Sequence, residues 1–129
     1  MIDYSIYLVT GRDLLPAGKD FFETLEQVML FASLQGGVTV VQIREKKADT
    51  AEKSANGVDI ALAINASGVH VGQSDMPIAI ARKLLPKGAI IGASCNNLEE
   101  VKKALTDGAD YIGIGAVWAT TTKALDKPV

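Results

Sequence analysis

The sequence has few aromatic residues and a single cysteine. Phenylalanine, tyrosine and tryptophan together make up 5% of its 129 residues. A core must therefore be filled by aliphatic and β-branched side chains, as is usual in α/β folds. Cys95 has no second cysteine with which to form an internal disulfide bond. This absence favours a reducing compartment, and we expect a cytoplasmic protein.

No charge of one sign dominates, and no hydrophobic run is long. Thirteen basic and fifteen acidic residues give a formal net charge of −2. Basic residues are not interleaved with aromatic ones, so nucleic acid is not an expected partner. The apolar stretches are far shorter than a membrane span, and residues 1–4 do not resemble the basic start of a signal peptide. We therefore expect no membrane association.

What the sequence does contain is an alternation of short β-branched runs with segments of helical period. This alternation is typical of parallel strands joined by crossover helices. Strands are predicted at residues 5–10, 38–44, 68–71, 89–93 and 111–115. Helices are predicted at residues 21–34, at 58–64, after Met76-Pro77, and at 98–106, where Asn97 and Glu100 form a variant of the capping box.

Apolar residues at helical spacing predict which face of each helix packs inward. In the helix at 21–34 this face would contain Phe22, Leu25, Val28, Met29 and Ala32. In the two later helices it would contain Ile80 and Leu84, and then Leu98, Val101 and Leu105.

The order of elements predicts an α/β fold of the eight-stranded βα-barrel (TIM-barrel) type, but an incomplete one. About five parallel strands with crossover helices are visible, in one partial domain over residues 1–129. A complete barrel needs about 250 residues. Only eleven residues separate Lys46 from Val58. A crossover alone takes about 10–12 residues, so a helix and a further strand do not fit there.

Polar residues follow the predicted strands at their carboxyl ends, which is where ligands sit in parallel βα proteins. Cations, hydroxyls, glycines and one carboxylate in these positions suit a pyrophosphate or doubly phosphorylated ligand with Mg²⁺. The residues concerned are Gln42, Arg44 and Lys46 on the second strand, Gly72, Gln73, Ser74 and Asp75 after the third, Gly92, Ala93 and Ser94 at the fourth, and Gly113, Gly115, Thr120, Thr121, Thr122 and Lys123 at the last.

Each of these residues also has a simpler interpretation. Arg44 and Lys46 could form an ordinary solvated strand end, and Asp75 could be a carboxylate that complements a helix N-terminus. His70, on a strand, is more often a hydrogen-bonded core histidine than a catalytic one. Cys95 has no histidine close in sequence and is expected to serve packing.

Several motifs make the sequence similar to the thiamine phosphate synthase family, and its opening resembles the N-terminal domain of the fungal bifunctional enzyme. GVHVGQSDMP at residues 68–77 and YIGIG…TTTK at residues 111–123 are the most specific. The other matching segments are DYSIYLVT at 3–10, GGVTVVQIREK at 36–46 and IIGAS at 90–94.

The resemblance implies a reaction between small-molecule substrates. The family joins 4-amino-5-hydroxymethyl-2-methylpyrimidine pyrophosphate to thiazole phosphate, giving thiamine phosphate and pyrophosphate. Carried over by motif position, catalytic roles fall to Arg44, Lys46, Ser94 and Lys123. Substrate contacts fall to these four residues and to Gln42, Gln73, Thr120 and Thr122, and the resemblance makes Asp75 a ligand of the Mg²⁺ cofactor.

The sequence also departs from the family's pattern. The Asn-Asp pair that ends the family's third strand has no clear counterpart before Val58, and two strands expected after Lys123 are absent. We therefore expect impaired condensation by this chain. The alternatives are a non-catalytic remnant or mis-spliced fragment that keeps a phosphate-binding face and, with less support, a thiazole tautomerase-like protein. Assembly as a homo-oligomer stays open.

Overall fold

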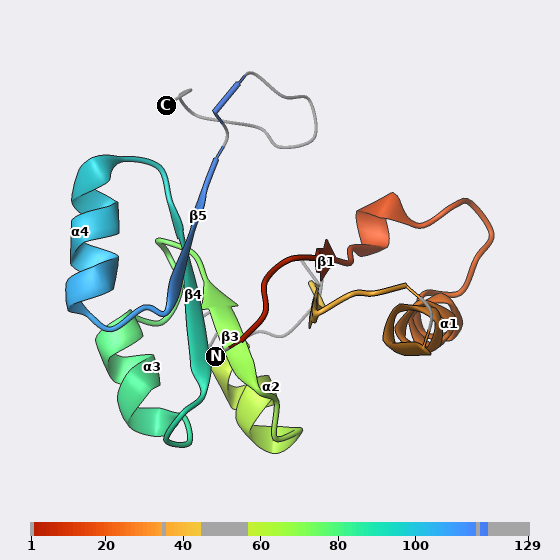
Figure 1. The fold of residues 1–129 in the computed structure, drawn as a ribbon, viewed down its shortest axis with the longest axis horizontal. Helices are drawn as coiled ribbons and strands as arrows, with labels where there is room; N and C mark the ends of the chain where they lie inside the picture. Colours follow the sequence, from red (N-terminus) through yellow and green to blue (C-terminus); the bar gives the residue numbers. More distant parts are fainter. Residues whose placement is uncertain (1, 35, 45–56, 116, 119–129) are drawn as a thin grey trace. The chain divides into compact units, whose positions relative to one another are not determined.

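The computed structural model describes residues 2–34, 36–44, 57–115 and 117–118 (Figure 1). The chain divides into two compact units, Met1–Asp49 and Thr50–Val129. In both units the described strands pair in parallel and helices connect them, which confirms the predicted α/β class. The prediction of a single domain over residues 1–129 stays a prediction.

The first unit is a βα unit followed by one further strand. Asp20 caps the N-terminus of the helix in this unit, because the carboxylate of Asp20 accepts a hydrogen bond of 2.9 Å from the backbone N–H of Glu23. The two strands pair in the register Tyr7 with Val40 and Val9 with Gln42. The elements are β1 (Tyr7–Val9), the 3₁₀ helix η1 (Arg12–Leu14), α1 (Phe21–Leu34) and β2 (Val40–Gln42).

The second unit is a three-stranded sheet with helices between its strands. The strand order is β3-β4-β5, and all pairs are parallel. The capping box was predicted correctly, since Asn97 Oδ1 accepts a hydrogen bond of 2.9 Å from the N–H of Glu100. The elements are α2 (Val58–Ala63), β3 (Gly68–Val71), α3 (Ile78–Leu84), β4 (Ile90–Cys95), α4 (Leu98–Thr106) and β5 (Tyr111–Ile114).

The core of the second unit lies between this sheet and its helices. Because strand side chains alternate between faces, Val71, Ile91 and Ala93 point to the same side, and all three are buried. They pack against small or medium side chains of the helices, among them Ala81 and Ala104. Figure 1 shows α3 and α4 beside β4. The opposite face of the sheet is therefore the one that carries polar side chains.

The predicted inward faces of the helices are largely wrong. Ile80 and Leu84 on α3 are 47% and 51% exposed, whereas Ala81 is fully buried. On α4, Val101 packs against the core as predicted, but Leu98 and Leu105 are exposed and Ala104 is buried instead. Two neighbouring rows of a helix can both hold apolar residues, and small alanines let a helix approach the sheet closely. Apolar spacing therefore could not identify the buried row.

In helix α1 the buried residue is again the neighbour of the predicted one. Phe21 is 7% exposed and buried, while Phe22, which we predicted to face inward, is 69% exposed. Leu25 and Val28 are half-buried as expected, and Met29 is exposed. Ala32 lies outside the side chains that the structure describes.

The predicted incomplete barrel is not confirmed by the described residues. Five parallel strands are present among them, but they form one sheet of two strands and one of three, and neither sheet closes. No helix in the described part of the chain is long and apolar enough to cross a membrane.

Candidate functional site

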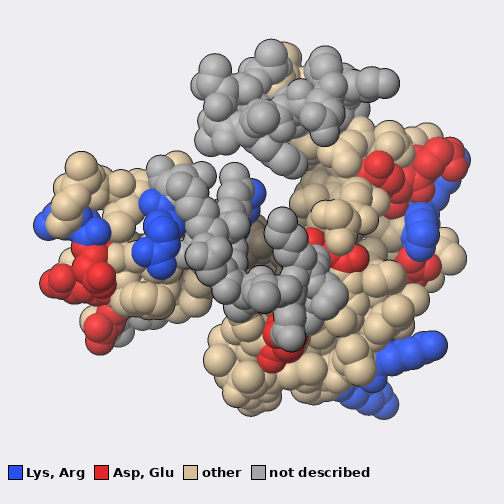
Figure 2. Space-filling model, turned by 180° about the vertical axis from the view of Figure 1, so that it is seen from behind, with Lys and Arg blue, Asp and Glu red and all other residues tan. Residues whose placement is uncertain are grey.

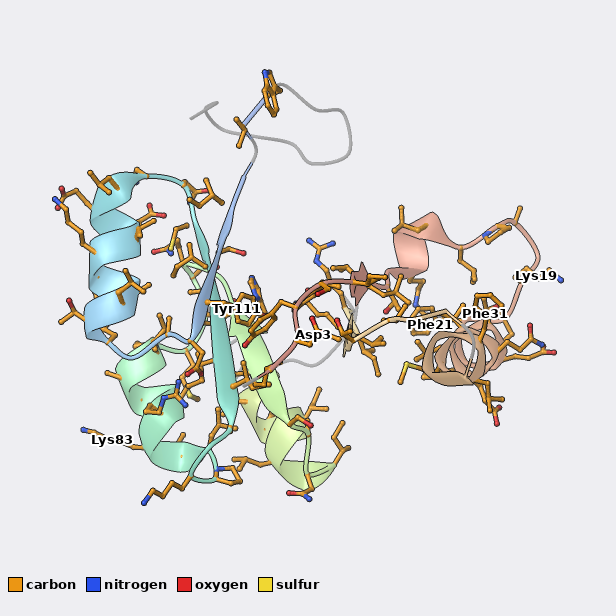
Figure 3. The ribbon with its side chains drawn as sticks, viewed as in Figure 1. Asp3, Lys19, Phe21, Phe31, Lys83 and Tyr111 are labelled. Atoms are coloured by element: carbon orange, nitrogen blue, oxygen red, sulfur yellow. The ribbon has the colours of Figure 1, made fainter. Side chains whose placement is uncertain are left out.

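Three residues lie in one row across the sheet of the second unit, on the face opposite the helices. His70 on β3 pairs with Gly92 on β4, and Gly92 pairs with Tyr111 on β5. Since Gly92 has no side chain, the rings of His70 and Tyr111 meet across the central strand, with centroids 5.4 Å apart. A Cβ atom at Gly92 would overlap the ring of Tyr111. Figure 3 shows Tyr111 on the side of the sheet away from α3 and α4.

His70 joins Tyr111 to Ser94 through hydrogen bonds at both ring nitrogens. The Nδ1 atom of His70 lies 2.9 Å from the Tyr111 hydroxyl oxygen. Its Nε2 atom lies 2.9 Å from Oγ of Ser94. Ser94 follows Gly92 by two positions on β4 and so points to the same face. All three side chains are half-buried. His70 is hydrogen-bonded as predicted, but it is half-buried on the face opposite the core and is not a core residue.

Two of the predicted site residues, Gln73 and Ser94, are brought together by the ends of β3 and β4. The side-chain amide of Gln73 donates a hydrogen bond of 2.6 Å to the backbone carbonyl of Ser94. Gln73 is exposed and follows β3 by two residues, so its contact with Ser94 spans the carboxyl edge of the sheet. The side chain of Gln73 thus contacts the backbone of Ser94, which lies inside β4 (Ile90–Cys95) and not after it as predicted.

Asp75 closes the turn that leads from β3 to α3. Its Oδ2 atom accepts a hydrogen bond of 2.7 Å from the N–H of Gly72. The backbone N–H of Asp75 in turn donates to the carbonyl of Gly72 at 3.2 Å. Asp75 therefore serves the turn, whereas the simpler interpretation had placed its carboxylate at a helix N-terminus; α3 begins at Ile78 without an acidic residue in its first turn.

The described residues supply part of a Mg²⁺ site at most. No group of three histidine, cysteine, aspartate or glutamate side chains among them is arranged to hold a metal ion. Mg²⁺ is commonly held by one or two carboxylates together with substrate phosphates and water. Asp75 fits the role of one such carboxylate, because only its Oδ2 atom is occupied by the turn.

Gln42 and Arg44 belong to the first unit, at the end of β2. Thr10 ties this end to β1, since its N–H donates to the carbonyl of Gln42 at 3.0 Å. The N–H of Arg44 donates to the Thr10 hydroxyl at 3.4 Å. Gln42 and Arg44 are half-buried, and Ile43 between them is exposed, as the alternation predicts. The predicted residues Lys46, Thr120, Thr122 and Lys123 lie outside the described part of the chain.

Cys95 serves packing, as expected. Its side chain is 1% exposed within the core of the second unit. Burial raises the pKa of the Cys95 thiol, and the negative charge of Glu100 raises it further. A thiol in this environment is a poor nucleophile at neutral pH.

Positive and negative side chains lie near one another on the face of the molecule drawn in Figure 2. Among the described side chains in Figure 2, blue Lys and Arg groups alternate with red Asp and Glu groups.

Sequence reasoning missed Tyr111 as a site residue. The signal that would have found it is the register of three strands, which places Tyr111 and His70 on either side of Gly92.

Comparison with known proteins points to one family. The family model described as "Thiamine monophosphate synthase" matches residues 54–129. The thiamine-phosphate synthase of Alkaliphilus oremlandii is 45% identical, over 99% of this chain and 68% of that protein. The Schizosaccharomyces pombe protein named "Probable thiamine biosynthetic bifunctional enzyme" is 44% identical, over 95% of this chain and 26% of its own length.

A solved structure agrees with these relatives. The thiamine phosphate pyrophosphorylase from Pyrococcus furiosus superimposes with a TM-score of 0.67 and 36% sequence identity, over 88% of this chain and 60% of that chain. The chain thus spans about two thirds of the length of these single-function relatives. The alignment with the A. oremlandii protein runs over 147 positions, more than the 129 residues present here, so that relative has additional residues inside the matched stretch.

Proposed function

The chain belongs to the thiamine monophosphate synthase family, and from this premise we propose that it is a thiamine phosphate synthase domain. Its substrates would be the pyrimidine pyrophosphate and the thiazole phosphate, which it would join to thiamine phosphate. The observation that carries this proposal is the meeting of Gln73 and Ser94 at the carboxyl edge of the β3–β4 pair. We propose that this edge receives the pyrophosphate group.

In this reaction the thiazole nitrogen forms a bond to the pyrimidine methylene carbon. The bond from that carbon to the pyrophosphate oxygen breaks, and pyrophosphate leaves with the electron pair. Negative charge grows on the leaving group, so hydrogen-bond donors and cations aimed at it lower the barrier. We assign such contacts to the hydroxyl of Ser94 and to the side chains of Arg44, Lys46 and Lys123. Gln73 holds the backbone of Ser94 in place through its 2.6 Å hydrogen bond.

The remaining predicted residues have roles in binding. We propose that Gln42 contacts the pyrimidine substrate and that Thr120 and Thr122 contact the thiazole phosphate. Asp75 would hold Mg²⁺ through the carboxylate oxygen that the Gly72 turn leaves available. When bound, Mg²⁺ neutralises phosphate oxygens. We also propose that the fold is an incomplete βα barrel and that the protein is cytoplasmic.

A second candidate function is binding of phosphate groups without catalysis. It is favoured by the length of the alignment, because residues that the A. oremlandii relative has inside the matched stretch are missing here. We place this loss between Glu52 and Val58, where the sequence is too short for a strand and a helix. A site without those residues would bind pyrophosphate but would not condense the two substrates.

Two measurements test these proposals. Pyrophosphate binding is expected of both the synthase and the non-catalytic binding protein, and condensation distinguishes them. Calorimetry with Mg²⁺-pyrophosphate should show binding that Ser94→Ala and Arg44→Ala weaken at least tenfold. Ser67→Ala and Lys83→Ala remove a hydroxyl and a cation from exposed positions and should leave binding unchanged. No heat at millimolar ligand would refute the binding site. A condensation assay with both substrates should give little thiamine phosphate, and rapid turnover would refute the impaired state.

A further inference from the structure

We propose that His70 and Tyr111 are positioning residues that direct the hydroxyl proton of Ser94 toward the bound anion. The proposal rests on the proposed function, because it takes pyrophosphate as the ligand of Ser94. It adds two residues, neither of which the sequence motifs had placed in the site. The three groups form one continuous chain of hydrogen bonds, from the Tyr111 hydroxyl through the imidazole of His70 to Ser94.

The chemistry of the three groups determines the direction of this chain. A neutral imidazole has one N–H donor and one acceptor nitrogen. A phenol, with an ordinary pKa of about 10, is a far stronger acid than an aliphatic alcohol and therefore a better donor. Its oxygen is also the poorer acceptor, because its lone pair is delocalised into the ring. The Tyr111 hydroxyl should therefore donate to Nδ1 of His70, which leaves the ring proton on Nε2.

A proton on Nε2 of His70 determines the direction of the Ser94 hydroxyl. Its Oγ atom lies 2.9 Å from Nε2 and accepts the hydrogen bond from that nitrogen. The hydroxyl proton of Ser94 then cannot point at His70, and it can be donated to another acceptor on the same face of the sheet. A phosphate oxygen is such an acceptor. With the opposite tautomer, Ser94 would donate to Nε2 and present only lone pairs to an anion, which would repel it.

Two glycines make room for the hydrogen-bonded series Tyr111, His70 and Ser94. Gly92 lets the rings of His70 and Tyr111 meet, since any side chain there would overlap Tyr111. At Gly113, the partner of Ser94 in register, a Cβ atom would lie 3.4 Å from Cε1 of His70. Both glycines have strand backbones, so space for the rings, and not an unusual φ angle, is what they provide.

The tautomer of His70 can be measured directly. His70 is the sole histidine of the sequence, so a long-range ¹H–¹⁵N spectrum of the ¹⁵N-labelled chain contains one imidazole. At a pH of about 8.5, above the ordinary range of imidazole titration, we expect a protonated Nε2 and an unprotonated Nδ1. Tyr111→Phe should shift the ring toward a mixture of tautomers, and the control Tyr4→Phe should not. A protonated Nδ1 in the wild-type chain would overturn the proposal.

Measurements of pyrophosphate affinity test whether Tyr111 and His70 affect binding through Ser94. We expect Tyr111→Phe to weaken Mg²⁺-pyrophosphate binding about three- to tenfold, which is the range for one hydrogen bond. In the Ser94→Ala background the same change should have no further effect, because the group it positions is gone. Equal losses in both backgrounds would overturn the proposal and indicate that Tyr111 only stabilises the sheet. Circular dichroism confirms that each variant folds.

The two proposals fail in different ways. If the wild-type chain binds no pyrophosphate, the proposed function fails, and with it the anion end of the hydrogen-bond chain. The spectrum of the free protein still decides the order from Tyr111 to His70 to Ser94. If pyrophosphate binds and Ser94→Ala weakens binding, but the ring proton lies on Nδ1, the proposed function stands and the positioning role is refuted.

Discussion

Arg82 and Asp110 form an ion pair of 2.7 Å that links α3 to the residue before β5. The guanidinium also donates hydrogen bonds to the carbonyls of Ala89 and Gly108, each at 2.5 Å. Asp110 in turn accepts a hydrogen bond of 2.7 Å from the N–H of Ile91. One pair of side chains thus joins α3 to the starts of β4 and β5. It lies at the amino ends of the strands, away from the edge where Gln73 meets Ser94.

Loss of this pair should destabilise the second unit without affecting its ligand edge. We expect Arg82→Ala to lower the free energy of unfolding by about 1–2 kcal/mol, because several hydrogen bonds to charged groups are lost at a site partly open to solvent. Urea unfolding followed by circular dichroism measures this change. Lys102→Ala breaks the exposed Lys102–Glu99 pair and should change stability by less than about 0.5 kcal/mol. Equal effects of both variants would contradict the structural role of Arg82.

The same pair makes stability depend on acid pH. Burial acts to raise the pKa of Asp110, but the hydrogen bonds from Arg82 and Ile91 and the charge of Arg82 outweigh it and hold the pKa below its ordinary value of 3.8. A lowered pKa in the folded state contributes stability that is fully present above pH 3.8 and is lost as the pH falls through the lowered value. Urea midpoints measured from pH 5 down to pH 2 should fall less steeply for Asp110→Asn. An unchanged slope would show that other carboxyl groups dominate.

Gly92 should tolerate no side chain. We expect Gly92→Ala to cost about 1–3 kcal/mol of folding stability, because its Cβ atom would overlap Tyr111 and force the ring out of place. Thermal unfolding measures the loss, and the imidazole spectrum of His70 should change as Tyr111 moves. The matched control is Gly115→Ala, since nothing lies within 4 Å of a Cβ atom at that position. A Gly92→Ala variant of wild-type stability would mean that Tyr111 has room to move.

Cys95 should react slowly with thiol reagents in the folded chain. Its burial and the nearby charge of Glu100 raise the pKa of the thiol, so that both access and the thiolate fraction are low at pH 8. Reaction with a chromogenic disulfide reagent should be at least about a hundredfold faster in concentrated urea, where only the ordinary pKa of a cysteine applies. Rapid reaction without denaturant would contradict the packing of β4 against α4.

Local features of the fold were predictable from the sequence. The helices Phe21–Leu34 and Leu98–Thr106 and the strand Gly68–Val71 begin and end where predicted. The two helices depend on interactions between residues close in sequence, such as the hydrogen bond between Asn97 and the N–H of Glu100. The strand shows in the sequence through its β-branched residues, although its pairing with β4 is not local. The buried rows of the helices were not predictable, because apolar spacing alone cannot decide whether Ala81 or Ile80 faces the sheet.

The sequence by itself determined the family, the alternation of strands and helices, and the polar residues that follow each strand. Motifs and hydrophobic periodicity are local properties, so they can be recognised in the sequence without knowing how the strands pair. Only the tertiary structure decided that Tyr111 reaches His70 across Gly92 and that His70 reaches Ser94. Strand register brings these residues together over separations of 24 and 41 positions. No local pattern carries that information, because parallel pairing is settled by the packing of the whole sheet against its helices.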